Sequence, residues 1–454
     1  MGFEDAITEG LGLQGAEIGN VDFQRDELSI SIDVTWPFHL SRCGQCGDFL
    51  LKIHSWVTRE VRAPGFGVYK TVRLNLRYAR GLCRSCNRVR TSRVLFVHPE
   101  FESMTCGLAE TAGRMMEEMT CAAAARLLDL EEKTLWRLDQ WRMERMHGQL
   151  RLDEITKNLD LSKMSADEVH FRTVNEDHRA HPFAPRWAVK FITNLVCTKE
   201  AKVIANASGR DARALAECLK TLSKPQRLSI NFFALDMNSG FFKAVTKLCP
   251  NAEIAVDRFH LVQQLNERFD KVRKEEFYKA RRGDNDFLKA MLSPQRRFIL
   301  VDRTAVLSIE ERNMLGKLKV LNDNIHNAML IVDYFHRLLD EKGITGFRRL
   351  LAQWYGLIRT ARLKPLTDFA RLVRQYRKNI ENYIRSNLTT AISEGLNNKI
   401  RVLKAMAYGY TNEKSFKLKI LQRCGFLNSR YIDTKPWLWF VPPEGPGTEP
   451  DHAI

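Results

Sequence analysis

The sequence contains no long uncharged apolar stretch, and this absence argues against a membrane-spanning protein. A transmembrane helix needs about 20 consecutive, mostly apolar residues, and no uncharged run in the chain approaches that length. The first residues also lack the basic segment and the apolar core of a secretory signal peptide. We therefore expect a cytoplasmic protein with no membrane partner.

Acidic residues are too few to balance the basic ones, since 71 Lys and Arg face 54 Asp and Glu, a formal net charge of +17. An excess of this size favours a polyanionic partner, most often nucleic acid. The imbalance is strongest in residues 43–98, which contain eleven Lys and Arg but only two acidic residues. The sequence therefore predicts a DNA-binding, nucleoid-associated protein. A basic protein of membrane surfaces is the weaker alternative.

Of the ten cysteines, four form two Cys-x-x-Cys pairs. These pairs are Cys43 with Cys46 and Cys83 with Cys86, each in a short segment that contains Gly or Asn. In a reducing compartment such pairs indicate a metal site rather than disulfides. Two cysteine turns carried on β-strands are typical of a zinc ribbon, in which four thiolates bind one structural Zn²⁺ in a tetrahedron.

The separation of the two pairs is longer than in the shortest zinc ribbons, and we expect a β-hairpin between them. Alternating apolar and polar residues over 69–78 predict one of its strands. Two alternatives to the four-cysteine site are cysteines without a metal, and a site in which His54 or His98 replaces one thiolate. The other six cysteines are most simply core residues.

Residues 106–150 predict helices, because small residues are followed by a tight turn and then by a basic, aromatic segment. A small-residue helix starts at Thr120, a turn follows at Asp129, and a second helix starts at Lys133. This order is typical of a DNA-binding helix-turn-helix. A helical hairpin without a DNA-binding role is the alternative.

From residue 163 the pattern changes to apolar, strand-like runs separated by helical segments. Strands are predicted at 165–173, 187–197, 202–207 and 228–237. A helix at 211–222 precedes the fourth of these strands. A second helix, a fifth strand and a long helix follow it. This is the order of an RNase H-like fold, in which the first and fourth strands are neighbours. Asp167 and Asp236 are therefore expected side by side, although Asp236 alone is equally consistent with a helix N-cap.

Glu394 lies in a helical segment with polar residues at spacings of four and three, Asn398 and Arg401. These three side chains share one helix face. The apolar residues of the segment are expected to face the core: Leu396, Ile400 and Leu403. If Glu394 meets Asp167 and Asp236 at one sheet edge, the three carboxylates supply the oxygen ligands that Mg²⁺ prefers.

We predict a multidomain α/β protein in which a zinc ribbon and a helix-turn-helix precede an RNase H-like mixed sheet interrupted by an all-α insertion. Length alone suggests roughly three domains. The predicted segments are the zinc-ribbon DNA-binding domain (1–98), the helix-turn-helix (99–155), the first part of the catalytic core (156–281), the insertion (282–385), the C-terminal helical part of the core (386–440) and a disordered tail (441–454).

The most specific motifs are Asp167-Glu168, Leu235-Asp236-Met237, Val256-Asp257-Arg258-Phe259-His260 and Glu394-Gly395-Leu396-Asn397-Asn398-Lys399-Ile400-Arg401. In this order, and behind the paired cysteines, they resemble the DDE transposases of the ISL-three family of bacterial insertion sequences. The resemblance covers nearly the whole chain.

The resemblance implies that Asp167, Asp236 and Glu394 bind two catalytic Mg²⁺ ions, for which Mn²⁺ can substitute. Phosphoryl transfer from DNA uses two hard cations about 4 Å apart, which supports this set of ligands independently. Glu168 is a competing ligand, but adjacent strand residues face opposite sides of a sheet, and we choose Asp167.

Two further features follow from the resemblance. The segment from Asp257 to His260 is similar to a motif that lies beside the active site in transposases with helical insertions. Trp354 lies in the predicted insertion, where an aromatic residue of related transposases stacks on a base displaced at the cleavage site. A core tryptophan is an equally good interpretation of Trp354.

Basic residues on two predicted helices are expected to contact DNA. Arg137 and Arg142 lie on the second helix of the helix-turn-helix, and Lys399 and Arg401 follow Glu394. Arg401 is expected to meet a DNA phosphate, and a salt bridge on the helix surface is its alternative.

The sequence thus predicts a transposase that binds the terminal inverted repeats of its insertion sequence, cuts DNA at the element ends and joins the 3′-hydroxyl ends to target DNA. We expect it to act as a homodimer or higher homo-oligomer on DNA. A non-catalytic DNA-binding regulator derived from a transposase is the alternative, and retention of all three acidic residues argues against it.

Overall fold

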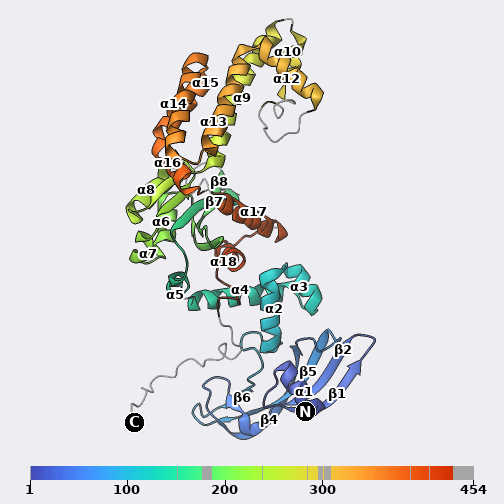
Figure 1. The fold of residues 1–454 in the computed structure, drawn as a ribbon. Helices are drawn as coiled ribbons and strands as arrows, with labels where there is room; N and C mark the ends of the chain where they lie inside the picture. The colour runs from blue at the N-terminus through green and yellow to red at the C-terminus, as the bar shows by residue number, and fades with distance from the viewer. Residues whose placement is uncertain are drawn as a thin grey trace. The chain divides into compact units, whose positions relative to one another are not determined.

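The computed structural model describes residues 2–150, 152–175, 187–237, 239–283, 285–294, 300, 308–388, 390–407 and 409–432 (Figure 1). The chain divides into two units, one of residues 1–150 with 403–454 and one of residues 151–402. The predicted disordered tail, 441–454, lies outside the described residues. None of the helices in the described ranges combines the length and the hydropathy needed to cross a membrane.

The first unit contains a sheet of six strands beside helix α1 (Phe3–Leu11). The order is β1-β2-β5-β6-β3, and β4 also pairs with β5. The strands are β1 (Glu17–Gln24), β2 (Ser29–Thr35), β3 (Arg42–Cys43), β4 (Leu50–Ala63), β5 (Thr71–Cys83) and β6 (Val89–Arg93). β4 and β5 are long antiparallel strands between the two cysteine pairs, which confirms the predicted hairpin.

Three helices follow this sheet: α2 (Cys106–Glu118), α3 (Cys121–Leu128) and α4 (Glu132–Gln149). The Thr120 side chain caps α3 by accepting a hydrogen bond from the backbone N–H of Ala123. Asp129 ends α3 in the left-handed conformation, with φ of 51°, and turns the chain toward α4. The helices and the turn predicted for residues 106–150 are thus present.

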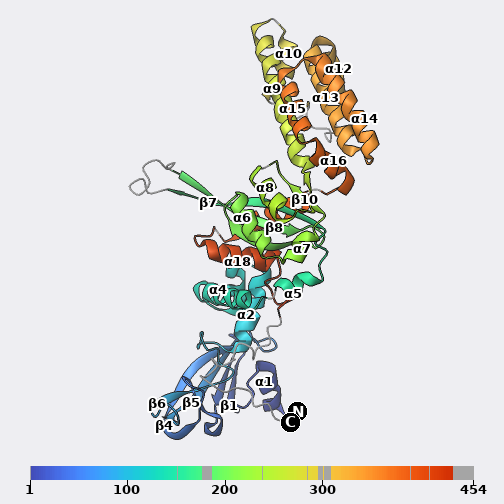
Figure 2. The ribbon, with the colours of Figure 1, turned by 90° about the vertical axis from the view of Figure 1, so that its left-hand side faces the viewer.

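Helix α18 (Glu413–Cys424) packs against α2 and α4, as Figure 2 shows for α4. Lys419 donates hydrogen bonds of 2.7 Å to Oδ2 of Asp139 on α4 and 2.8 Å to the carbonyl oxygen of Met116 on α2. Gln422 donates a hydrogen bond of 3.0 Å to Oδ1 of the same aspartate. The Asp139 carboxylate is fully buried. Its negative charge is therefore compensated by Lys419 and Gln422 of α18.

A second buried network joins the same parts of the chain. Glu117 on α2 accepts a 2.5 Å hydrogen bond from Arg142 on α4, and 3.0 and 2.7 Å bonds from the backbone N–H and hydroxyl of Ser429. Residues 386–440 were predicted as the C-terminal helical part of the catalytic core, and their described part from Leu403 on packs in the first unit. In this segment Lys419, Gln422 and Ser429 contact buried carboxylates of the first unit.

The second unit is built on a sheet of five strands in the order β11-β10-β7-β8-β9. The strands are β7 (Lys163–Asn175), β8 (Trp187–Cys197), β9 (Lys202–Ser208), β10 (Phe232–Leu235) and β11 (Glu253–Val256). β7, β8 and β9 are antiparallel neighbours, whereas β10 runs parallel to β7 and to β11. The first and fourth strands of this unit are therefore neighbours, as the sequence predicted.

The predicted fourth strand starts too early, because residues 224–228 form a short helix. Ser223 and Gln226 make a capping box at its N-terminus, and Pro225 stands in its first turn. This short helix is α7 (Lys224–Leu228), and the other helices around the sheet are α5 (Leu152–Lys157), α6 (Ala212–Lys220), α8 (Ser239–Leu248) and α17 (Ala391–Met406).

The described part of residues 282–385 is helical, in agreement with the predicted insertion. It contains α10 (Asp286–Met291), α12 (Ile309–Leu321), α13 (Asp323–Asp340), α14 (Ile344–Ala361), α15 (Lys364–Gln375) and α16 (Arg377–Ser386). These helices share an apolar core with the long helix α9 (Arg258–Arg282). Figure 1 shows α9, α13, α14 and α15 running alongside one another.

The buried Lys419–Asp139 pair leads to a stability prediction. Lys419→Met keeps the volume but leaves the buried carboxylate without its cation, and we expect it to destabilise α4 by about 3–5 kcal/mol. Amide hydrogen exchange of the α4 peptides in the full-length protein measures this free energy of opening.

Lys414→Met is the matched control, because Lys414 also joins α18 to α4, through a 2.7 Å pair with Glu144. That pair is exposed, with 69% and 42% of the two side chains accessible, so its loss should cost at most about 1 kcal/mol. Equal effects of the two substitutions on α4 would contradict the structural role given to Lys419.

Candidate functional site

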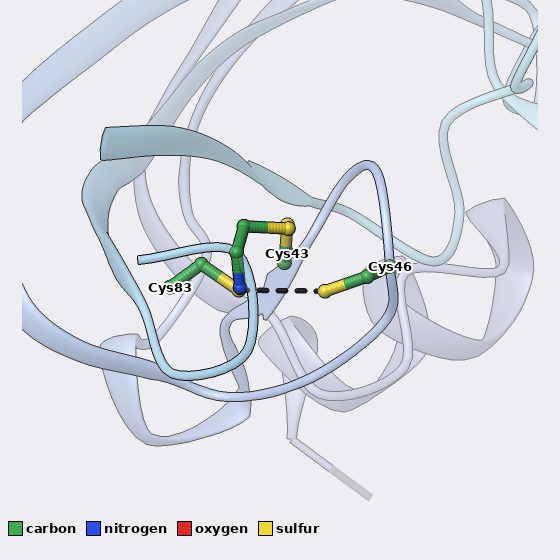
Figure 3. Close-up of side chains that lie close together, drawn as sticks. Cys43, Cys46 and Cys83 are labelled. Carbon is green, nitrogen blue, oxygen red and sulfur yellow. Dashed lines mark hydrogen bonds between the residues drawn. The ribbon is translucent and has the colours of Figure 1, made fainter. Parts of the chain in front are cut away.

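The two cysteine pairs come together at one end of the β4–β5 hairpin. The ligand atoms of all four cysteines lie within 4.8 Å of one another, and Figure 3 shows Cys43, Cys46 and Cys83 directed toward a common point. Sγ of Cys46 is 3.4 Å from Sγ of Cys83, and Sγ of Cys43 is 3.9 Å from Sγ of Cys86. Sulfurs that bind one Zn²⁺ tetrahedrally at 2.3 Å are about 3.8 Å apart, so the cluster could hold this ion.

The cluster is formed by two similar turns. In the first, the N–H of Gly47 donates to the carbonyl of Cys43, and in the second the N–H of Asn87 donates to the carbonyl of Cys83. Gly47 and Asn87 both have a left-handed backbone, with φ of 79° and 48°. Gly and Asn tolerate this conformation best, which explains why these residue types follow the second cysteine of each pair.

No histidine joins the cysteine cluster in the described ranges. His98 is buried, and its Nδ1 accepts hydrogen bonds from the backbone N–H groups of Glu100 and Phe101. Burial lowers the pKa of His98 to about 4, and the charge of Arg145 contributes to the same shift. His54 is exposed, with its Nδ1 3.5 Å from the Ser55 hydroxyl. The histidine alternative to the four-cysteine site therefore has no support in this geometry.

The second candidate site is a row of polar side chains across the five-stranded sheet. β10 is parallel to β7, and Ala234 is paired with Ser165. Two residues further along each strand direction, the same register places Asp236 level with Asp167. Leu235 pairs with Val256, so the next residues on these strands are Asp236 and Asp257. Residues level with one another on neighbouring strands point to the same face. The sheet therefore carries Asp167, Asp236 and Asp257 side by side.

Helix α17, which carries Glu394 in its first turn, is attached to this row by hydrogen bonds. Asn397 Nδ2 donates to Asp167 Oδ2 at 2.6 Å, and the hydroxyls of Ser393 and Ser165 are 2.5 Å apart. The N–H of Thr390, just before the helix, donates to Asp257 Oδ1 at 3.3 Å. Glu394 therefore belongs to a helix that contacts the same strand as Asp167.

The predicted orientation of α17 is wrong in part. Ile400 and Leu403 are buried as expected, but Leu396 is only half-buried. Its place toward the sheet is taken by the polar residues Ser393 and Asn397. An apolar pattern cannot identify such polar residues. However, Ser393, Asn397 and Ile400 follow one another at spacings of four and three, which places them on one helix face, and sequence reasoning missed this signal.

Asp257 and His260 lie near Asp236. Nδ1 of His260 is 3.7 Å from Oδ1 of Asp236. Asp257 is 2% exposed, and its Oδ2 has no hydrogen-bond partner among the described residues. Such a buried carboxylate oxygen lacks the compensation that a water molecule or a cation would supply.

Burial raises the pKa of the Asp167 carboxyl, and the neighbouring carboxylates of Asp236 and Asp257 act in the same direction, against the Glu168 N–H and His260. Burial, Asp167 and Asp236 likewise raise the pKa of Glu168. A divalent cation relieves such accumulated negative charge. The set of oxygen donors therefore suits a divalent cation, although among the described residues only the four cysteines form a group of three or more potential ligands that could hold one metal ion. Ligands that are divided between two ions need not all meet at one point.

Comparison with known proteins identifies the family of the chain. Residues 183–420 match the sequence model of a protein family, the ISL-three DDE transposases, whose description is "Transposase". The match covers slightly more than half of the chain. The chain belongs to the ISL-three family of DDE transposases.

Individual relatives agree with this assignment. The chain is 25% identical over 419 residues to the transposase for insertion sequence element IS1001 of Bordetella parapertussis, which covers 91% of this chain and 97% of that protein. It is 20% identical over 244 residues to the transposase for insertion sequence element IS1557 of Mycobacterium tuberculosis, which covers 50% of this chain and 55% of that protein.

The basic residues that were predicted to contact DNA differ in exposure in this transposase. Arg137, Lys399 and Arg401 are exposed. Arg401 donates a 2.7 Å hydrogen bond to Asn398 one turn earlier. Arg142 is 1% exposed and is bound to Glu117, so the prediction that it contacts DNA is not supported. A basic helix pattern does not distinguish an arginine on the surface from one that neutralises a buried glutamate.

Trp354 of the transposase lies in the core of the helical insertion. Its side chain is fully buried, and its Nε1 donates a 3.0 Å hydrogen bond to the carbonyl of Ile331. The rings of Phe335 and Phe369 lie 5.0 and 5.9 Å away. This geometry favours the core interpretation, because stacking on a DNA base would require the indole to leave all of these contacts.

The cysteine cluster leads to a prediction of metal content. The full-length transposase, purified without chelator, should contain about one zinc ion per chain. Cys46→Ser should lose it, since a hydroxyl is a poor replacement for a thiolate and Cys46 is exposed enough to be replaced without a cavity. Elemental analysis of the purified proteins measures both.

Cys106→Ala is the control, because Cys106 is buried outside the cluster and its removal should leave the zinc content unchanged. A wild-type protein that is folded over residues 43–98 but contains no zinc would contradict the prediction.

Proposed function

We propose that this transposase binds the terminal inverted repeats of its insertion sequence, cuts DNA at the element ends and joins the freed 3′-hydroxyl ends to target DNA. The observation that carries the proposal is the row formed by Asp167 on β7 and by Asp236 and Asp257, which directly follow β10 and β11, with the helix of Glu394 hydrogen-bonded to Asp167. In open sheets of this kind, ligands bind at the carboxyl ends of parallel strands.

The strand arrangement supports an RNase H-like core for this chemistry. Three antiparallel strands are followed by two parallel ones, in the order β11-β10-β7-β8-β9. Asp167 lies on the central strand of this sheet, next to Asp236, and Asn397 of α17 reaches it with a hydrogen bond. Glu168 points to the opposite face, which supports the choice of Asp167 over Glu168.

Asp167, Asp236 and Glu394 are proposed to hold two Mg²⁺ ions, for which Mn²⁺ can substitute. When bound, these ions activate the attacking oxygen and stabilise the leaving oxygen of an in-line displacement at phosphorus. The protein's own part is to orient these carboxylates. Asp257 anchors the start of α17, and His260 lies beside Asp236, so both are proposed to support the site.

DNA-end binding is proposed to reside in the first unit. Its exposed basic residues include Arg137 on α4 and Arg77 on β5, whose guanidinium lies 4.8 Å from the ring of the partly exposed Trp56. Basic side chains interleaved with aromatic ones suit a phosphate backbone and its bases. Because α2 and α4 depend on α18, the end-binding unit is proposed to need residues 403–432 as well as 1–150.

The exposed Lys399 and Arg401 on α17 are proposed to contact the phosphates of the DNA that is being cut. An insertion sequence has two ends that must be joined to one target, so we propose that the transposase acts as a homodimer or higher homo-oligomer on DNA. The alternative function, a DNA-binding regulator, needs no metal at the carboxylates, and the following experiment distinguishes the two.

Asp236→Asn removes one ligand charge without changing the side-chain volume. We expect cleavage of DNA carrying the element's ends to fall by more than about 100-fold, because bound metal supplies several kcal/mol of transition-state stabilisation. Binding of the same DNA should persist. Single-turnover cleavage and a binding assay with the full-length protein measure the two effects.

Asp211→Asn is the matched control, since Asp211 caps α6 by accepting a 2.9 Å hydrogen bond from the N–H of Ala214. Asn is as good an N-cap as Asp, so this variant should cleave like the wild type. If Asp236→Asn also cleaves like the wild type, Asp236 is no more than a helix cap and the two-metal proposal fails.

A further inference from the structure

The side of α17 that faces the sheet is polar next to the carboxylate row, which is unusual for the buried side of a helix. Asn397 is 3% exposed and Ser393 is 1% exposed. Burying an amide is unfavourable unless it is hydrogen-bonded, and Asn397 meets this requirement with its 2.6 Å bond to Asp167 Oδ2. An apolar residue would fill the same place at lower cost, so the amide indicates a role beyond packing.

Both oxygens of Asp167 are held by one donor each. The N–H of Glu168 donates to Oδ1 at 2.8 Å, and Nδ2 of Asn397 donates to Oδ2 at 2.6 Å. Two donors on different oxygens fix the plane of a carboxylate, and each oxygen keeps a second lone pair. Asp167 is therefore oriented and remains able to bind a cation.

The same amide also relates Asp167 to Glu394. Asn397 follows Glu394 by three residues on α17, so the two side chains leave adjacent turns of one helix. A hydrogen bond from Asn397 to Asp167 thus fixes the position of the helix that carries Glu394 relative to the strand that carries Asp167.

We propose that Asn397 is a positioning residue that orients Asp167 and aligns the helix of Glu394 with it, so that both carboxylates take the same pair of divalent cations. The inference rests on the proposed function of these carboxylates. Asn397 touches a metal ligand rather than the substrate, and residues in this position typically change metal affinity or activity by about 10- to 100-fold.

A role in orienting Asp167 can be separated from a role in holding α17 in place. The contact between the hydroxyls of Ser393 and Ser165, and the bond from Thr390 to Asp257, attach α17 to the sheet without Asn397. Removing the amide should therefore leave the helix docked and the protein folded. Removing the serine pair should weaken docking but leave the donor to Asp167 intact.

The experiment titrates Mn²⁺ alone into the full-length, zinc-loaded protein and follows free Mn²⁺ by electron paramagnetic resonance. The binding that is lost in Asp236→Asn defines the carboxylate site. Asn397→Ala should weaken this binding by about 10- to 100-fold and should shift the Mn²⁺ dependence of cleavage by a similar factor. Its thermal unfolding without Mn²⁺ should match that of the wild type.

Two variants serve as comparisons. Asn398→Ala removes the neighbouring amide, which is exposed and accepts a hydrogen bond from Arg401, and should bind Mn²⁺ like the wild type. The double variant Ser165→Ala and Ser393→Ala should lower the unfolding temperature and change Mn²⁺ affinity less than Asn397→Ala does.

Wild-type Mn²⁺ affinity in Asn397→Ala, or an equal loss in Asn398→Ala, would overturn the inference while leaving the proposed function intact. If the wild type and Asp236→Asn bind Mn²⁺ identically, the proposed function itself fails, because the carboxylates then hold no metal. A loss of affinity in Asn397→Ala that is matched by a lower unfolding temperature without Mn²⁺ would reduce Asn397 to a packing role and also overturn the inference.

Discussion

Repulsion between neighbouring carboxylates is the constraint on which the second unit depends. Asp167 on β7 is level with Asp236 and Asp257, which directly follow β10 and β11, and burial together with like charge raises the pKa of Asp167. A fold tolerates such a row only if donors or cations compensate it. The N–H of Glu168, the amide of Asn397 and the N–H of Thr390 supply donors, while His260 lies beside Asp236. Binding of divalent cations completes this compensation in the proposed function.

In the first unit, buried carboxylates are compensated by residues from a distant part of the sequence. Asp139 is bound by Lys419, 280 residues later in the sequence, and Glu117 is bound by Ser429. The first unit therefore includes the segment that follows the second unit in the sequence. The chain passes from one unit to the other within α17, whose first residues belong to the second unit and whose last residues belong to the first.

Much of this organisation was predictable because it follows from periodicity and residue type. The succession of strands and helices and the meeting of four cysteines needed only alternation, helical spacing and the Cys-x-x-Cys signal. The expected neighbourhood of Asp167 and Asp236 needed in addition the strand order of an RNase H-like fold. The family resemblance added Glu394, whose helix the structure attaches to the strand of Asp167.

What the sequence did not reveal was which polar residues are buried and with what partner. Arg142 was predicted to contact DNA and instead neutralises Glu117, and Asn397 was overlooked although it contacts Asp167. The packing of residues 403–432 in the first unit was missed for the same reason. Helical patterns record apolar faces, whereas a polar residue in a buried network has the same local sequence as one in solvent.

The central claim is that Asp167, Asp236 and Glu394 together hold the catalytic metal ions. Anomalous diffraction at the manganese edge, from crystals of the full-length protein grown with Mn²⁺, tests it most directly. The account predicts two peaks about 4 Å apart, with Asp167 touching at least one of them and both Asp236 and Glu394 among the ligands. Peaks that involve Asp257 or Glu168 but leave Glu394 without a metal contact would contradict it.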